Sequence, residues 1–522
     1  MVIPDLAPAL QRLPAPLPVW QGRVDRDGWR EAARRVADAG GRLISVWGVD
    51  RSALGQGQAV CAAYGRPEGL VWLDLVLADR DSSFPDLSAH FPCAGRLQRA
   101  VADLSGLQAE AARDTRPWLD HGLWPGQTPP LRQGAAPACA DLAAAATLPA
   151  DYPFVAVAGD GVHEIAVGPV HAGIIEPGHF RFSVVGEKLL RLEAHLGYVH
   201  KGMERRFTEL APRDAHRLAG RVSGDSTVAY AWAYSMALES AWRCQIPARA
   251  AALRALMLER ERVANHLGDL GALGNDAAFT FGLAQFSRLR EDWLRLSGEA
   301  FGHRLMMDAT LPGGVASDLA PLMRDRLRQQ CDDIELELRV LRPIYDEHAG
   351  LQDRFIGTGR VTPALAAQLG LTGLAGRASG QAADLRCDQA WAPYDRLAVV
   401  KAGSREGDVA ARVAVRFDEA FESLRLIRAL CAGLPDGAIH QPLQPQNQDN
   451  QASLGAGWVE GWRGEVLVTL EVGSDQRILR CHCHDPSWQN WPVLEHAVIG
   501  NIVPDFPLIN KSFNLSYSGH DL

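Results

Sequence analysis

The 522-residue sequence lacks several features that would place it quickly in a class of protein. It contains no run of about 20 apolar residues, the length that a membrane-spanning helix needs. Its 62 acidic residues outnumber its 53 lysines and arginines, so no basic surface for a nucleic acid is expected. We find neither a glycine-rich nucleotide-binding loop nor an internal repeat. The amino-terminal stretch lacks the basic region and the uninterrupted apolar core of a signal peptide, which predicts a cytoplasmic chain.

Cysteines are few and scattered, with nine in the whole chain. No cluster of them has the spacing of an iron–sulfur site, and dispersed thiols are typical of a reducing compartment. Only Cys481 and Cys483 lie close together, in the stretch RCHCHDPSW. Two cysteines and two histidines are zinc ligands in principle, but successive residues of a strand point to opposite faces. Ordinary core and surface roles are therefore the favoured interpretation, and a metal at this stretch stays open.

Composition and periodicity predict an α+β chain of more than one domain. Residues 1–125 are predicted to form a small α/β domain, with helices at GWREAARRVADAGG and GRLQRAVADLSG and strands between them. Residues 126–152, rich in proline and alanine, are predicted to be a linker. Residues 153–522 begin with strands and continue with long helices at 249–274, 319–345 and 410–432. They return to strands near EVLVTLEV and QRILRCHCH, and the apolar C-terminal segment is expected to pack against the body of the protein.

Two segments carry polar side chains that are suited to chemistry. The Gly- and Pro-punctuated stretch GPVHAGIIEPGHFRF contains His171, Glu176 and His179, and Glu and His are the usual carriers of protons. A β-turn in which these groups only cap the chain is the alternative. Arg463, in GWRGEV between two strands, is available to a buried anionic or polar ligand, although a plain turn explains it equally well.

The helix at 249–274 also carries a group of charged residues. Arg262, His266 and Asp269 are three or four positions apart and therefore share one face. Glu259 and Glu261 belong to the same helix. The favoured prediction is a solvated charged face with ion pairs within the helix.

At this point the motifs resemble a known family. Residues 168–522 resemble the large subunit of group 4 (hydrogenase-3/4, formate hydrogenlyase type) nickel–iron hydrogenases and, more distantly, the D subunit of complex I. Residues 1–125 resemble the C subunit of complex I, and the order of the two parts matches a fused C–D chain. The matching stretches include GPVHAGIIEPGHFRF, LGYVHKGMERRF, ERERVANHLGDLGALGND, RASGQAADLR, EGWRGEV and the segment from DPSWQNWP to the end.

The resemblance places the nickel-ligand positions of the family on Ser223, Ser226, Ser516 and Gly519. All four positions carry cysteine in a working hydrogenase of this family. A hydroxyl does not supply the soft ligand field of a thiolate, so the resemblance implies that the nickel–iron centre is absent.

Other parts of the same cavity are retained, and they imply a role. Glu176 corresponds to the carboxylate that carries protons from the metal, and Arg463 to the arginine that overhangs the cavity. In complex I the cavity accepts a quinone headgroup, and His171 corresponds to a histidine of that site. The position of the tyrosine partner of the headgroup falls near Gly224, so that partner is missing or is supplied by another part of the structure.

The resemblance implies a subunit of a membrane-associated oxidoreductase, bound peripherally to the inner face of the cell membrane. Electrons would come from an iron–sulfur subunit, since no cluster is expected here, and would pass to a quinone-type acceptor with protons drawn through Glu176 and His179. Ion-pumping membrane-arm subunits would be the other partners, and NAD(P)H, formate and ferredoxin stay open as donors. Three alternatives remain: a true nickel–iron hydrogenase, a non-catalytic coupling or scaffold subunit, and a free-standing soluble binding protein.

Overall fold

The N-terminal part of the chain is built on a five-stranded sheet. The computed structural model describes residues 10–78, 81–122, 124, 128–132, 152–172, 175–445 and 452–522. In the first sheet the strand order is β1-β2-β5-β4-β3, with β2 parallel to β5 and the other pairs antiparallel. The strands are β1 (Gln11–Arg12), β2 (Val19–Val24), β3 (Arg42–Asp50), β4 (Gln58–Arg66) and β5 (Gly69–Val76).

Two helices accompany this sheet, close to where the sequence predicts them. Helix α1 (Arg26–Asp38) starts at Asp25, whose carboxylate accepts from the Gly28 N–H. Helix α2 (Ala94–Ser105) ends at Gly106, which has a φ of 70° and therefore suits a left-handed C-cap. Two short parallel strands, β6 (Ser83–Pro85) and β7 (Gln108–Glu110), flank α2. Most of the predicted linker at 126–152 lies outside the described residues.

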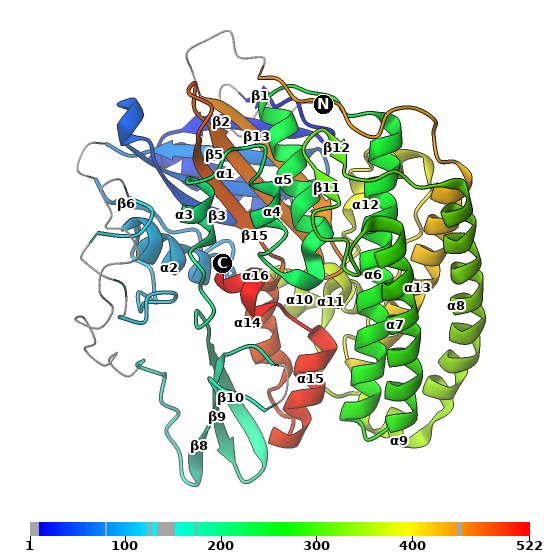
Figure 1. Ribbon diagram of the computed structural model, residues 1–522. Helices are drawn as coiled ribbons and strands as arrows, with labels where there is room; N and C mark the ends of the chain where they lie inside the picture. The colour runs from blue at the N-terminus through cyan, green and yellow to red at the C-terminus, as the bar shows by residue number, and fades with distance from the viewer. Residues whose placement is uncertain are drawn as a thin grey trace.

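A second antiparallel sheet of three strands projects from the body of the molecule (Figure 1). Its strand order is β10-β9-β8, and the C-terminal helices pack beside its base. The buried core around it contains side chains of the N-terminal sheet, of this sheet and of the C-terminal helices. These parts of the chain therefore share one apolar cluster. The strands are β8 (Val162–Val167), β9 (His179–Val185) and β10 (Lys188–His195).

Long helices form the side of the molecule opposite the N-terminal sheet (Figure 1). Helix α6 packs against α7 and α13, and α13 packs against α8. The bundle consists of α6 (Ala248–Asp276), α7 (Thr280–Phe301), α8 (Pro321–Glu347) and α13 (Val409–Ala432). The predicted helices at 249–274, 319–345 and 410–432 are confirmed to within a few residues.

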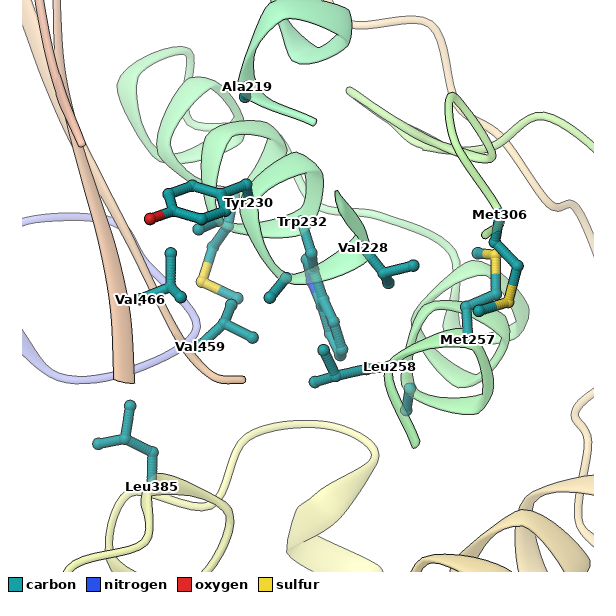
Figure 2. Packing of buried hydrophobic residues seen from close by; sticks show 14 of the residues in the cluster. Ala219, Val228, Tyr230, Trp232, Met257, Leu258, Met306, Leu385, Val459 and Val466 are labelled. Atoms are coloured by element: carbon teal, nitrogen blue, oxygen red, sulfur yellow. The ribbon is translucent and has the colours of Figure 1, made fainter. Parts of the chain in front are cut away.

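Helix α5 (Thr227–Ala241) is the central element, because every one of its residues is buried. It lies between the bundle and a third antiparallel sheet, β13 (Ser453–Glu460), β14 (Glu465–Val472) and β15 (Ile478–His484). Figure 2 shows Trp232 and Val228 of α5 among side chains of α6, and Val459 and Val466 beside Tyr230. A helix that is apolar all round is stable only when it is enclosed in this way.

The remaining helices and strands are short, and several of them join the larger units. They are α3 (Met203–Phe207), α4 (His216–Ala219), β11 (Thr310–Leu311), β12 (Gly314–Val315), α9 (Ala349–Phe355), α10 (Pro363–Leu369), α11 (Gly373–Ala378), α12 (Leu385–Asp388), α14 (Ser487–Ala497), α15 (Phe506–Phe513) and α16 (Tyr517–Asp521). The C-terminal segment is tied into the body, as predicted, because the Leu522 carbonyl accepts from the backbone N–H groups of Lys201 and Met203. No helix in the described ranges combines the length and the apolar character that crossing a membrane would need.

The predicted solvated charged face on helix α6 is wrong. Glu259, Arg262 and His266 are completely buried, and Glu261 and Asp269 are at most 5% exposed. Their main partners come from other elements: Arg386 contacts Glu259, Glu419 contacts His266, and Arg416 contacts Asp269. Buried charges are stable only when they are paired or hydrogen-bonded. The charged residues of α6 therefore belong to a buried network of ion pairs that links this helix to neighbouring elements.

Candidate functional site

Two segments that are far apart in the sequence meet at the centre of the molecule. The first is the turn at Gly224–Ser226, which leads into α5, and the second is the start of α16. The hydroxyl oxygens of Ser223 and Ser516 lie 3.1 Å apart. Both side chains are buried, and Ser516 caps α16 by accepting from the Gly519 N–H at 2.8 Å. The four positions expected to correspond to the nickel ligands therefore gather from these two segments.

Lys201 ties the two segments together from one side. Its ammonium donates to the carbonyls of Val222 at 3.1 Å and Ser518 at 3.2 Å. Burial lowers the pKa of Lys201, while the carboxylate of Glu176 acts in the opposite direction. Lys201 stands in the quoted stretch LGYVHKGMERRF, although nothing in the sequence alone assigns it this position.

The centre of the site is an ion pair between Asp225 and Arg463. The guanidinium binds both carboxylate oxygens, Nη1 to Oδ1 at 2.7 Å and Nη2 to Oδ2 at 2.6 Å. Arg463 lies in the turn between β13 and β14 and is 6% exposed, whereas Asp225 is 35% exposed. The guanidinium also lies 4.0 Å from the Trp462 ring centroid. A two-point contact of this kind fixes both side chains in one orientation.

The two serines of the first segment also bind this ion pair. Ser223 donates to Asp225 Oδ1 at 2.8 Å, Ser226 donates to the same oxygen at 3.3 Å, and Arg463 Nη1 lies 3.3 Å from Ser226 Oγ. Burial by itself would raise the pKa of Asp225, but Arg463 and these hydroxyls outweigh it and hold the pKa at about 2. Asp225 is therefore ionised at neutral pH. Reasoning from the sequence missed it, although it is an acid between two serines in an otherwise apolar stretch.

Glu176 lies at the outer end of a polar chain that leads to this pair. Its carboxylate is exposed and accepts from the Ser518 backbone N–H at 3.2 Å. The Ser518 hydroxyl lies 3.5 Å from that of Ser516, which in turn meets Ser223. A line of hydroxyls therefore runs from near Glu176 to Asp225, and hydroxyls that both donate and accept can relay protons.

The two predicted histidines do not join this chain. His171 donates from Nε2 to the Gly178 carbonyl at 2.8 Å and so braces the loop between them. His179 lies on β9 with its ring centroid 5.0 Å from that of Phe154, and its Nε2 has no partner in the described structure. Burial and the nearby Arg181 lower the pKa of His179, so it is neutral at pH 7.

The residues present do not fit a nickel–iron centre. The four positions offer three hydroxyls and a glycine, and hydroxyls are poor ligands for a soft metal site. A Cβ atom on Gly519 would lie 2.3 Å from Oδ2 of Asp485. That carboxylate is fixed by the Tyr230 hydroxyl at 2.7 Å and by the Ser487 N–H at 2.8 Å. A cysteine at position 519 would therefore require this buried network to move.

Cys481 and Cys483 are both buried on β15, and the two histidines beside them point elsewhere. His482 contacts Glu204 at 2.6 Å and Ser45 at 2.8 Å, and His484 contacts Gln489 at 2.9 Å. Across the residues that the structure describes, no three His, Cys, Asp or Glu side chains are grouped so as to hold a metal ion. His482 instead joins β15 to the N-terminal sheet, because its ring also stacks 4.7 Å from that of Trp47.

Comparison with known families agrees with the two-part arrangement. Residues 22–138 match the family "Respiratory-chain NADH dehydrogenase, 30 Kd subunit", and residues 269–455 match "Respiratory-chain NADH dehydrogenase, 49 Kd subunit". Residues 201–269, which include the Ser223–Ser226 segment, match the family "Nickel-dependent hydrogenase".

Individual proteins are similar over most of the chain. The sequence is 30% identical to formate hydrogenlyase subunit 5 of Escherichia coli over 92% of this chain and 85% of that protein. It is 31% identical to hydrogenase-4 component G of the same organism over 85% of this chain and 77% of that protein. A chain of the membrane-bound sulfane sulfur reductase, an archaeal respiratory membrane complex, superposes with a TM-score of 0.64 at 25% identity, covering 69% of this chain and 99% of that one. The chain therefore belongs to the family of oxidoreductase subunits that unites the large subunits of hydrogenase-4-type complexes with the fused C/D subunits of NADH-quinone oxidoreductase.

Proposed function

We propose that this chain is the acceptor-reducing subunit of a membrane-associated complex of this family and that it works without nickel. Electrons come from a neighbouring iron–sulfur subunit and pass to a quinone-type acceptor beside Arg463. Ion-pumping subunits of a membrane arm couple this reduction to proton translocation, and the chain is bound peripherally at the inner face of the membrane. Relatives that belong to multisubunit membrane complexes support this assembly.

The polar chain from Glu176 to Asp225 is the observation that carries the proposal. Reduction of a quinone to a quinol consumes two electrons and two protons, so its site needs a proton supply. The hydroxyls of Ser518, Ser516 and Ser223 line a path toward the ion pair, and Glu176 adjoins its outer end, where its carboxylate accepts from the Ser518 backbone N–H. The Arg463 guanidinium is also a hydrogen-bond donor of the kind that stabilises charge developing on a carbonyl oxygen.

A scaffold role is the second candidate, and one observation favours it. The Nε, Nη1 and Nη2 groups of Arg463 already donate to Asn514, Asp225 and Ser226. These bonds engage four of the five guanidinium N–H groups, so an acceptor that accepts from more than one of them must displace one of these partners. If no acceptor binds there, the ion pair serves only to hold the β13–β14 turn against the turn that leads into α5.

Quinone reduction by the purified complex, with electrons supplied through its partner subunit, tests the proposal. We expect Glu176→Gln to slow reduction by at least about tenfold, because a neutral amide cannot pass protons on. Glu187→Gln changes another exposed glutamate, in the turn between β9 and β10, and should have no effect. Arg463→Lys should also slow reduction, whereas Arg51→Lys, at another arginine that is 6% exposed, should not.

Two outcomes contradict the proposal. Unchanged electron transfer in both Glu176→Gln and Arg463→Lys would favour the scaffold role. Nickel at one atom per chain in the purified complex would instead favour a true hydrogenase.

A further inference from the structure

Glu261 is a buried carboxyl that the proposed reaction does not yet use. It lies on α6 and is 5% exposed. Its two oxygens accept from the backbone N–H groups of Val228 at 2.6 Å and Ala229 at 3.2 Å, in the first turn of α5. In the described part of the chain it forms no ion pair, unlike the neighbouring Glu259 on the same helix.

The position of Glu261 follows from how the site uses Ser226. A serine before a helix normally caps it by accepting from an N–H of the first turn. Here Ser226 precedes α5 but makes no such bond, because its hydroxyl is turned toward Asp225 and Arg463. Glu261 accepts the N–H groups instead. The ion pair of the site and the cap of the central helix are therefore built within one five-residue stretch, 225–229.

A narrow crevice connects Glu261 with Asp225 and with the protein surface. Both residues line it, together with Asn265 of α6, whose amide donates to the backbone carbonyls of Asp225 at 2.8 Å and Glu261 at 2.9 Å. The enclosed space is about 10 Å³, which is room for about one water molecule and too little for an organic ligand. Arg304, with 54% of its side chain exposed, lines the outer part.

The charged groups around Glu261 come from several elements. Asp225 comes from the turn before α5, Arg260 and Arg262 from α6, Arg290 from α7, and Arg304 from the loop after α7. Arg262 is directed to the carbonyls of the β13–β14 turn, and Arg260 to Ser297 and Trp293, with its Nη1 buried and unpartnered in the described structure. No arginine in the described part of the chain therefore neutralises Glu261 directly.

We propose that Glu261 is the proton-holding group of this site: it carries a proton at rest, gives that proton up when an electron reaches the acceptor, and regains one through the crevice before the next electron arrives. The inference rests on the proposed function. The O–H bond of the Glu261 carboxyl breaks and an O–H bond forms on the reduced acceptor. A proton that enters from solvent through the crevice then restores the carboxyl, so that one electron and one proton in total leave the net charge of the site unchanged. No other bond forms or breaks in this step.

The electrostatics support this role. Burial raises the pKa of Glu261 to about 8, the negative charge of Asp225 acts in the same direction, and the two N–H groups of α5 oppose it only in part. The pKa of Asp225 is held at about 2, so the two acids of the crevice differ in protonation at neutral pH. A pair of carboxyl groups separated in this way is typical of proton-transfer sites.

An infrared-detected pH titration of the full-length chain tests the inference without any quinone. We expect a protonated carboxyl band that disappears with a midpoint near pH 8 in the wild type, is absent from Glu261→Gln and is unchanged in Glu187→Gln. Glu261→Asp keeps a carboxyl group and should shift the midpoint. If Glu261→Gln folds poorly, this shift of the midpoint in Glu261→Asp tests the inference in its place. Burial also raises the pKa of Glu460, to about 7, so a band from that residue is expected in every variant. A band with its midpoint near pH 8 that persists in Glu261→Gln would overturn the inference.

The pH profile of quinone reduction separates a proton-holding role from a capping role. If Glu261 only caps α5, Glu261→Gln lowers the rate equally at every pH. If it holds a proton, the limb of the profile near pH 8 disappears. A chain whose Glu261 titrates as expected but which reduces no quinone would contradict the proposed function alone.

Discussion

Replacing Asp225 by asparagine should expose how strongly the central ion pair stabilises the protein. The substitution keeps the shape of the side chain and removes its charge. Arg463 would then be a cation that is 6% exposed, and the described residues offer it no second ion-pair partner. Its Nε would still donate to the Asn514 carbonyl at 2.6 Å, so the position of the side chain should be retained.

The expected cost follows from the burial of the two partners. Removing one member of a fully buried ion pair costs about 3–5 kcal/mol, because the other charge is left uncompensated. Asp225 is 35% exposed, and water therefore screens part of the interaction. We expect Asp225→Asn to lower the free energy of unfolding by about 2–4 kcal/mol.

A double-mutant cycle with Arg463→Met isolates the pair from the other contacts of Arg463. Arg463→Met also loses the contact with the Trp462 ring, but that loss is common to the single and the double variant and cancels. Urea unfolding of the four proteins should give a coupling free energy of about 1–3 kcal/mol, with the double variant less destabilised than the sum of the single ones. Effects that add to within about 0.5 kcal/mol would refute the claim that the pair organises the site.

Three further changes test separate parts of the structure. Glu261→Gln should remove part of the loss of stability that the wild type shows as the pH rises from about 4.5, the ordinary pKa, to about 8, the folded pKa, because in this window the unfolded chain releases the proton first. Between pH 5 and 9 in urea unfolding, the wild type should lose at most about 5 kcal/mol more than Glu261→Gln, since Glu460, whose pKa is also raised, titrates in both proteins. Gly519→Ala places a methyl group 2.3 Å from the Asp485 carboxylate and should lower the melting temperature, whereas Gly95→Ala, with no atom within 4 Å of the new methyl, should not. Arg377→Met removes the partner of two buried glutamates and should cost about 3–5 kcal/mol in urea unfolding, an effect that a decrease below about 1 kcal/mol would contradict.

The elements of the fold were predictable because their apolar periodicity is strong. The helix predicted at 410–432 is found at Val409–Ala432, and the helix predicted at 249–274 at Ala248–Asp276. The environment of the charged residues on the helix predicted at 249–274 was not predictable. Arg262 and His266 have the spacing of a solvated ion-paired face, and that spacing is the same when the helix is buried. What distinguishes the two cases is a partner such as Glu419, which lies 153 residues away from His266.

The candidate site was predictable only in outline. The resemblance brought positions 223, 226, 516 and 519 together, and the 3.1 Å contact between Ser223 and Ser516 places the two segments side by side. Asp225 and Glu261 were missed as site residues because each looks ordinary in its own stretch of sequence. Asp225 belongs to the site because it pairs with Arg463, which is 238 residues away. Glu261 belongs to it because its carboxyl accepts from a backbone N–H group at the N-terminus of α5.

The serines, Asp225 and Arg463 are best understood as one unit. A guanidinium buried beside a metal–thiolate centre can be balanced by the negative thiolates, and neutral hydroxyls cannot take over that role. Asp225 supplies one negative charge for the one positive charge of Arg463, and the hydroxyls of Ser223 and Ser226 satisfy its oxygens. Restoring cysteines at the four positions would therefore add thiolates beside a carboxylate that already neutralises Arg463, and at position 519 it would also displace Asp485. The charges and hydrogen bonds of these polar groups therefore satisfy one another, and building a thiolate site here would require removal of Asp225 as well as replacement of the serines.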